Sequence, residues 1–287
     1  MIFVLVGYGV REYTRSVVDP QARFHLLYLD DGGSRVSLAS FDPVEQKIVV
    51  IEYPPELTIK SRSVGSYEMR NLYTLGGYKG DGGEFARRKV QGFMRLPIIG
   101  HMVNTNGLGE IERSLRQTLR QSLYRRGFET NLSWWDRFRL YQELNEASVR
   151  VVGKEELLRV GILVSTPDLG WGYNSERLIK YVGSSFFDWG VGQEGATVAI
   201  INESGLDGMG SDVASFLTSM GLDVVMVKSG NTIRETTSYT VQEPKQFVKA
   251  LTLIERVFPF EPYRIGETQE YRADIVFWIG KDALELF

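Results

Sequence analysis

The sequence predicts an α/β protein in two parts, and two observations carry this prediction. Apolar runs with strand and helix periodicity alternate along the chain, and a glycine-rich stretch at 187–195 divides them into two blocks. The chain has 287 residues, 43% of them hydrophobic, which is enough to bury two cores. We therefore expect an N-terminal segment at 1–20, a first domain at 21–187 and a second at 188–287.

The composition argues against several classes of partner. The 33 Lys and Arg residues are outweighed by 36 Asp and Glu residues, and a net charge of -3 does not favour nucleic-acid binding. The chain has no cysteine, and only His25 and His101 offer an imidazole. We therefore expect no disulfide, no dedicated metal site and no nucleic-acid partner, and we expect His25 to be a core residue.

The first residues leave two interpretations open. Met1–Val10 is an apolar run about half as long as the ~20 residues that a membrane-spanning helix needs. It is either the outer end of a membrane anchor whose beginning is missing from this chain, or a buried first strand.

The first domain opens with a predicted antiparallel meander. Phe24–Leu29, Val36–Phe41 and Lys47–Tyr53 are rich in β-branched and aromatic residues. Asp30–Gly33 separates the first two as a hairpin turn, an interpretation that we favour over a cation site built on Asp30 and Asp31.

Helical patterns follow the meander. Ile111, Leu115 and Leu119 form an apolar stripe within a predicted helix at Leu108–Arg126, whose back is rich in arginine. Ser133 is predicted to cap a helix that ends near Ala147. The other elements predicted here are a helix at Gly83–Leu96, a strand at Val160–Val164, a loop at Thr166–Tyr173 and a helix at Glu176–Val182.

The second domain is predicted to be a small α/β unit. Its predicted strands are Thr197–Asn202, Asp223–Val227, Thr236–Val241 and Ala273–Ile279, and its predicted helices are Ser211–Met220 and Pro244–Val257.

Two glycine-rich loops invite a phosphate-binding interpretation. Asn202–Gly210 joins a strand to a helix, but no Lys-Ser/Thr pair follows it, and Glu203 and Asp207 would repel a phosphate. Gly76–Gly83 contains Asp81 and is followed by Glu84. We therefore expect a structural turn and a loop before a helix. The Gly-x-Ser-x-Gly pattern of a hydrolase is absent.

The order of segments resembles the LytR-CpsA-Psr (LCP) family. Val36–Pro43, Lys47–Ile51 and Tyr53–Leu57 resemble the family's strand of form LxSIDP and the SIPRDLYV segment that follows it. The resemblance continues in Asn71–Gly77, in Gly83–Pro97 and in Leu132–Leu144. Gly195–Gly205, Gly221–Val225 and Ala273–Val276 resemble the LytR C-terminal domain.

The resemblance implies a fold and a reaction. It implies an LCP-like α/β sandwich with a central mixed sheet, followed by a small ferredoxin-like domain. Family members are implied to transfer a polyprenyl-pyrophosphate-linked glycan onto peptidoglycan, with Mg²⁺ and arginines on the diphosphate and the lipid in a hydrophobic tunnel. It also implies an extracytoplasmic location, with the N-terminus tethered to the cytoplasmic membrane.

The matched catalytic positions depart from the family pattern. The family's acidic residue falls near Ser34 or Arg35, and its arginine and aspartate become Pro55 and Glu56. The chain also looks shortened between His101 and Leu108. Loss of one charged group that stabilises a transition state raises the activation free energy by about 2.7–4 kcal/mol. The cations expected to hold an anionic head group are Lys60, Arg62 and Arg70.

These departures favour a non-catalytic LCP-like module, without a cofactor, that binds a lipid-linked or peptidoglycan glycan or an envelope partner. The first alternative is an active phosphotransferase that uses Mg²⁺ and one of the cations Lys60, Arg62 and Arg70 in a displaced role. The second is an assembly protein of an envelope complex that presents exposed aromatic side chains at Trp171, Phe186, Phe187 and Trp189.

Overall fold

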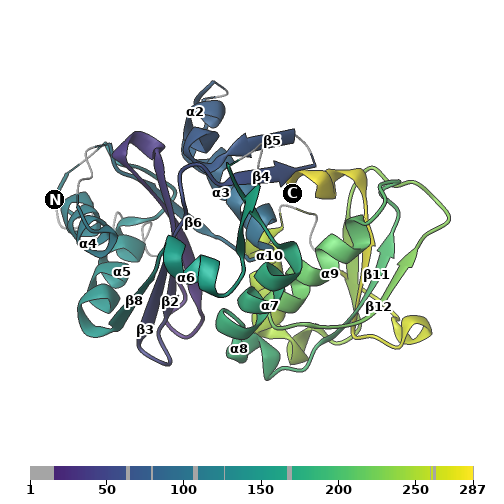
Figure 1. The fold of residues 1–287 in the computed structure, drawn as a ribbon. Helices are drawn as coiled ribbons and strands as arrows, with labels where there is room; N and C mark the ends of the chain where they lie inside the picture. Colours follow the sequence, from purple (N-terminus) through teal and green to yellow (C-terminus); the bar gives the residue numbers. More distant parts are fainter. Residues whose placement is uncertain are drawn as a thin grey trace. The chain divides into compact units, whose positions relative to one another are not determined.

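The structure, a computed structural model, describes residues 16–286 except 63, 64, 79, 106–108, 126, 167–169, 259, 261 and 262. The chain forms two compact units (Figure 1). The first takes in residues up to 60 together with 66–90 and 98–175, and the second takes in 61–65, 91–97 and 176–287. Met1–Val10, with its two interpretations, lies outside the described residues. The domain boundaries expected at 20/21 and 187/188 stay predictions.

A six-stranded mixed sheet forms the centre of the first unit, in the order β7-β6-β1-β2-β3-β8 (Figure 1). The predicted meander is confirmed, because β1, β2 and β3 are consecutive antiparallel neighbours. β6 runs parallel to β1, and β8 runs parallel to β3. The strands are β1 (Phe24–Asp30), β2 (Arg35–Asp42), β3 (Lys47–Glu52), β6 (Gly100–Val103), β7 (Glu129–Thr130) and β8 (Ser148–Val152).

The turn between β1 and β2 depends on glycine. Asp31–Gly33 forms one 3-10 turn, in which Gly32 and Gly33 have φ angles of 63° and 92°. A Cβ atom on Gly33 would come within 2.4 Å of the Tyr73 side chain. The expected hairpin turn at Asp30–Gly33 is therefore confirmed, and it needs glycine for both conformation and space.

Two helices, α4 (Ile111–Ser122) and α5 (Trp134–Glu146), pack on one face of this sheet (Figure 1). The predicted stripe of Ile111, Leu115 and Leu119 lies in the core between helix and sheet. His25 lies on a strand whose side chains are all buried, and its burial, with a smaller contribution from Arg23, lowers its pKa well below the ordinary value. The interpretation of His25 as a core residue is confirmed. The strand side chains in the same cluster are Phe24, Leu26, Tyr28, Ala39, Phe41, Ile48, Val50 and Met102.

A capping box begins α5, as Ser133 predicts. The Ser133 hydroxyl accepts a hydrogen bond from the Asp136 backbone N–H at 3.1 Å, and the Asp136 carboxylate accepts one from the Ser133 N–H at 2.9 Å. The same carboxylate accepts the backbone N–H groups of Val17 at 3.1 Å and Val18 at 3.0 Å. Asp136 therefore holds the first described residues against the start of the helix.

One strand and one loop of the first unit differ from the prediction. Val160 ends the helix α6 (Lys154–Arg159) as its C-cap, and the strand starts later, as β9 (Leu163–Thr166). The strand predicted at Val160–Val164 is present but begins three residues later than expected, because Gly161, with φ 71°, first ends the helix. The predicted loop at Thr166–Tyr173 instead contains β10, which pairs with β9. The other elements here are α2 (Leu72–Gly77), α3 (Gly82–Met94), β4 (Thr58–Ser61), β5 (Gly65–Glu68) and β10 (Gly170–Tyr173).

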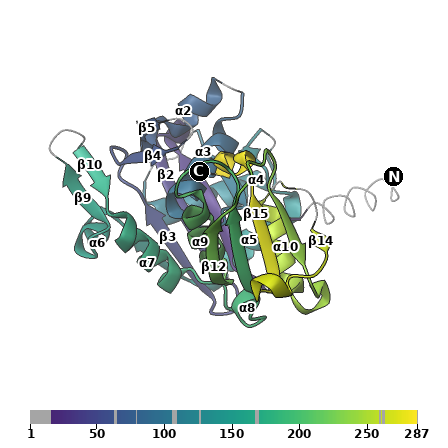
Figure 2. The same ribbon diagram turned by 90° about the vertical axis from the view of Figure 1, so that its right-hand side faces the viewer.

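The second unit contains a five-stranded sheet in the order β12-β11-β15-β13-β14, of which Figure 2 labels β12, β15 and β14. β11 runs parallel to both β12 and β15, whereas β13 is antiparallel to β15. The ferredoxin-like expectation is not confirmed, because the crossover through α9 makes β11 and β12 parallel neighbours. The elements are α7 (Ser175–Ser185), α8 (Trp189–Gly192), β11 (Thr197–Asn202), α9 (Met209–Ser219), β12 (Asp223–Ser229), β13 (Ser238–Val241), α10 (Val248–Val257), β14 (Arg264–Ile265) and β15 (Ile275–Ile279).

The loop between β11 and α9 is held by its own side chains. The Asn202 amide oxygen accepts hydrogen bonds from the Ser204 N–H at 3.2 Å and the Ser204 hydroxyl at 2.7 Å. The Glu203 carboxylate pairs with the Arg234 guanidinium at 2.9 Å. The interpretation of this loop as a structural turn is confirmed. No helix within the described residues is long and apolar enough to cross a membrane.

The four aromatic residues expected to be exposed differ in their surroundings. Phe186 is only 1% exposed and packs its ring 5.9 Å from that of Tyr181, so the expectation for this residue is wrong. Trp189 is 68% exposed, and the ring centroid of the half-buried Phe187 lies 5.1 Å from that of Trp189. Trp171 is half-buried in the first unit.

Replacing Asp136 with alanine is expected to lower the free energy of unfolding by roughly 3 kcal/mol, because several buried N–H groups lose their acceptor. Ser133→Ala, which removes one capping bond, is expected to cost about 1 kcal/mol. Urea denaturation followed by circular dichroism measures both values. Glu146→Ala, an exposed change on the same helix, is the control, and equal losses in all three variants would contradict the prediction.

Candidate functional site

A buried carboxylate marks the end of β1. Asp30 is 0% exposed, and it accepts hydrogen bonds from the Tyr28 hydroxyl at 3.2 Å, the Asn104 amide at 3.0 Å and the Ser114 hydroxyl at 2.8 Å. Burial raises the pKa of the Tyr28 hydroxyl, so this hydroxyl stays a donor. Because three polar groups satisfy the Asp30 carboxylate, it is held as a structural anchor.

Arg35 begins β2 directly opposite Asp30. Its guanidinium donates to the Glu52 carboxylate at 2.7 Å and to the Gly109 carbonyl at 3.0 Å, and it lies 3.6 Å from Asp30. Burial by itself would lower the pKa of Arg35, but the hydrogen bond and charge of Glu52, with the charge of Asp30, raise it overall. Two carboxylates thus compensate one guanidinium, which leaves no surplus positive charge for a diphosphate.

The matched catalytic positions carry ordinary local contacts. The Ser34 hydroxyl donates to the Asp31 carboxylate at 2.9 Å. The Pro55 carbonyl accepts the Arg70 backbone N–H at 3.1 Å, so the structure brings these two predicted residues together. Glu56 is exposed. Their proposed roles stay predictions.

The three predicted head-group cations belong to two different units and have different surroundings. Arg70 pairs with Glu68 at 2.7 Å in the first unit. Arg62 belongs to the second unit, where it pairs with Asp212 at 2.8 Å. Lys60 is exposed on β4. Two of the three cations therefore already have a carboxylate partner.

The residues near the matched positions do not fit a Mg²⁺ ion. This cation needs several oxygen ligands in an octahedral arrangement. Both oxygens of Asp30 accept hydrogen bonds from the protein, and Asp31 accepts one from Ser34. Within the described residues, no group of three or more His, Asp or Glu side chains is placed to hold a metal.

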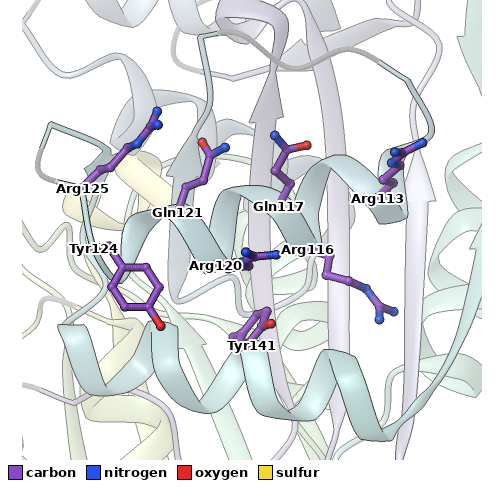
Figure 3. A pocket seen from close by; sticks show the side chains of 8 residues that line it. All are labelled: Arg113, Arg116, Gln117, Arg120, Gln121, Tyr124, Arg125 and Tyr141. Carbon is purple, nitrogen blue, oxygen red and sulfur yellow. The ribbon is translucent and has the colours of Figure 1, made fainter.

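A basic groove lies elsewhere, along the outer side of α4. Because Leu115 and Leu119 face the core, the arginine and glutamine side chains on the opposite side of this helix face outward. The groove has a volume of about 570 Å³, and Figure 3 shows Tyr141 of α5 facing it from the neighbouring helix. We call it the α4 groove, and its lining residues are Arg113, Arg116, Gln117, Arg120, Gln121, Tyr124, Arg125 and Tyr141.

The α4 groove has a surplus of positive charge. Arg116 pairs with Glu112 at 2.8 Å. Arg113, Arg120 and Arg125 have no ion pair within the part of the chain that the structure describes. The groove therefore offers guanidinium groups whose donors are available to an anion.

Sequence reasoning missed this groove. It identified the arginines at 113, 116, 120 and 125 as a basic helix back, which is a common property of solvated helices. The missing information was tertiary, because the opposite wall comes from Tyr141 of another helix.

Comparisons with known proteins give partial likenesses. No family model matches the chain, and no curated protein matches it. Solved structures that it resembles include TagT of Bacillus subtilis, with 10% identity, a TM-score of 0.40 and coverage of 58% of this chain and 91% of that one. A LytR-CPS2A-psr family protein, YwtF (TagT) with bound octaprenyl pyrophosphate lipid, has 12% identity, a TM-score of 0.40 and the same two coverages. A transcriptional regulator from Enterococcus faecalis has 13% identity, a TM-score of 0.41 and coverage of 57% and 87%.

One carboxyl outside the groove lining has an unusual pKa. The pKa of Glu143 is raised to about 7, chiefly by burial and to a smaller extent by the Asp42 and Glu146 carboxylates, and Arg139 opposes this rise. The ordinary value is 4.5, so the folded chain binds this proton more tightly than the unfolded chain does. Ionising Glu143 therefore lowers the free energy of unfolding. This loss is absent below pH 4.5, grows as the pH rises and is complete above pH 7.

Glu143→Gln is therefore expected to stabilise the protein by about 1–2 kcal/mol at pH 8, after discounting for partial exposure. At pH 4 the same change is expected to have little effect, because the carboxyl is already protonated. Urea denaturation at both pH values measures the difference. An equal effect at pH 4 and pH 8 would contradict the assignment.

Proposed function

We propose that this chain is an LCP-like cell-envelope protein that binds a phosphate-bearing glycan outside the cytoplasmic membrane. The glycan is either a lipid-linked precursor or a polymer of the cell wall. The observation that carries this proposal is the uncompensated charge of Arg113, Arg120 and Arg125 in the α4 groove. The LCP-like order of the strand segments gives the envelope context.

The chemistry of the α4 groove fits such a ligand. A guanidinium presents a planar set of donors that matches phosphate oxygens, and its charge does not depend on pH in the physiological range. The amides of Gln117 and Gln121 both donate and accept hydrogen bonds, as sugar hydroxyls require. Tyr124 and Tyr141 add aromatic surface with a polar end.

Binding without transfer is the function that the matched positions favour. A transferase needs surplus positive charge where the diphosphate leaves. Arg35 and Arg70 each have a carboxylate partner, and Pro55 carries no charge. These contacts support a glycan-binding module whose first unit has the scaffold but not the charge of a transferase.

Glycopolymer transfer onto peptidoglycan is the second candidate function. Arg35 favours it, because this cation lies at the strand end near the matched acidic position and its side chain is 26% exposed. A role in an envelope assembly is the third candidate, and the exposed Trp189 of the second unit favours it.

The Arg116→Ala/Arg120→Ala variant is expected to weaken binding of farnesyl diphosphate by at least ~10-fold, since two charge-assisted contacts are removed. Isothermal titration calorimetry at fixed salt measures the dissociation constants. Arg159→Ala is the matched control, because this exposed arginine lies outside the groove lining. Equal losses in the variant and the control would reject the groove as the binding site.

A turnover assay separates binding from transfer. The full chain is incubated with a polyprenyl-diphosphate-linked sugar and Mg²⁺, and release of the polyprenyl phosphate is followed. We expect no release above the rate without protein. Release that Arg35→Ala abolishes would establish the transferase instead.

A further inference from the structure

We infer that the α4 groove is a track for a linear polyanion with repeating phosphates, such as a phosphodiester-linked glycopolymer, rather than a socket for one diphosphate. This inference rests on the proposed function and names the class of ligand. It follows from how the polar side chains are distributed along α4 and around its C-terminal end.

The lining side chains from α4 and the turn after it form two rows. Arg113, Gln117, Gln121 and Arg125 follow one another at intervals of four residues, and Figure 3 shows these four side chains along one edge of the helix. Arg116, Arg120 and Tyr124 form a second row at the same interval. Residues four apart lie one above the other on a helix, so each row runs along its axis.

The first row has a cation at each end and amides between them. The helix ends at Ser122, but the Arg125 N–H still donates to the Gln121 carbonyl at 2.9 Å, so helical spacing continues to Arg125. With a rise of about 1.5 Å per residue, the 12 positions from Arg113 to Arg125 span roughly 18 Å. The two phosphoryl groups of a diphosphate share one bridging oxygen and cannot reach both ends of such a row. A polymer with a phosphate in each repeat reaches both ends and places its uncharged hydroxyl-bearing part beside Gln117 and Gln121.

Folding does not explain Arg113. It is the third residue of α4, where the N–H groups and the helix dipole favour negative charge and disfavour a cation. Arg113 is exposed and has no ion pair among the described residues. Arg120, in the last turn, does have a favourable position relative to the dipole. An unpaired arginine that opposes the dipole indicates a role in binding.

The first row and the second row would contribute differently to the affinity for a ligand. Arg116 and Arg120 lie within two turns of each other, so a single diphosphate can contact both. Arg113 and Arg125 add affinity only when a ligand extends along the whole helix. Affinity should therefore increase with ligand length, and the two end arginines should carry this increase.

The experiment uses the full chain and three soluble probes: inorganic pyrophosphate, tripolyphosphate and a poly(glycerol phosphate) of more than ten repeats. Competition against a labelled poly(glycerol phosphate), read by fluorescence anisotropy at fixed ionic strength, gives each affinity per molecule. We expect the longest probe to bind at least ~10-fold more tightly than pyrophosphate. We expect Arg113→Gln/Arg125→Gln to remove most of that difference while leaving pyrophosphate binding within about two-fold.

Three further variants separate binding from folding and from nonspecific charge effects. Arg116→Gln/Arg120→Gln is expected to weaken all three probes, and Arg159→Gln is expected to weaken none. Arg113→Gln alone is expected to unfold at the same or a higher urea concentration, since a cation is removed from the first turn of α4. Weaker binding together with unchanged stability is a result that a purely structural role would not produce.

The outcomes separate this inference from the proposed function. Equal affinity for pyrophosphate and the long polymer overturns the inference and leaves the proposed function standing. No binding of any phosphate probe rejects both. Binding to vesicles of phosphatidylglycerol that depends on the α4 arginines, with no effect of length among the soluble probes, also overturns the inference and assigns the surface to a membrane.

Discussion

The buried Asp30 carboxylate is the constraint on which the first unit depends. It ends β1 and accepts hydrogen bonds from Ser114 of α4 and from Asn104, which follows β6. The Tyr28 hydroxyl lies within 2.9 Å of the Ser114 and Thr118 hydroxyls and links the same strand to the next turn of α4. Because these bonds lie where water is excluded, a shift of α4 along the sheet would leave several polar groups unsatisfied. The position of the α4 groove is thus set from inside the core.

Local signals in the sequence were sufficient for much of the first unit. Asp30–Gly33 and the flanking apolar strands predict the hairpin, and Ser133 predicts the start of α5. Non-local features were not predictable in this way. The parallel pairing of β8 with β3, and that of β6 with β1, depend on chain crossovers that no single segment encodes. The strand predicted at Val160–Val164 was started three residues too early, because its β-branched composition was given more weight than Gly161, a helix-ending signal.

The balance of charge explains why the candidate site could be predicted only in part. The resemblance predicts an anion site near the strand ends, but there Arg35 has Glu52 as a partner and Arg70 has Glu68. Counting cations in the sequence cannot show that Arg35 is compensated, since Glu52 is 17 residues away and is joined to it only by the fold, whereas Glu68 lies only two residues from Arg70. The reverse holds for α4, where one carboxylate, Glu112, accompanies the four arginines of the groove. Proximity after folding, rather than composition, decides which cations are available to an anion.

A single helix serves both the core and the groove because helical periodicity separates its faces. Leu115 and Leu119 pack on the sheet, Ser114 and Thr118 bond to the strand end, and the two rows that include Arg113 and Arg116 point outward. The hydroxyls that fix α4 are each adjacent in sequence to a residue that faces the solvent. Substitutions in the outward rows can therefore change the affinity for an anion without disturbing the bonds around Asp30. By the same reasoning, a change at Ser114 should act on the groove only by displacing the helix that carries it, and would weaken every ligand regardless of its length.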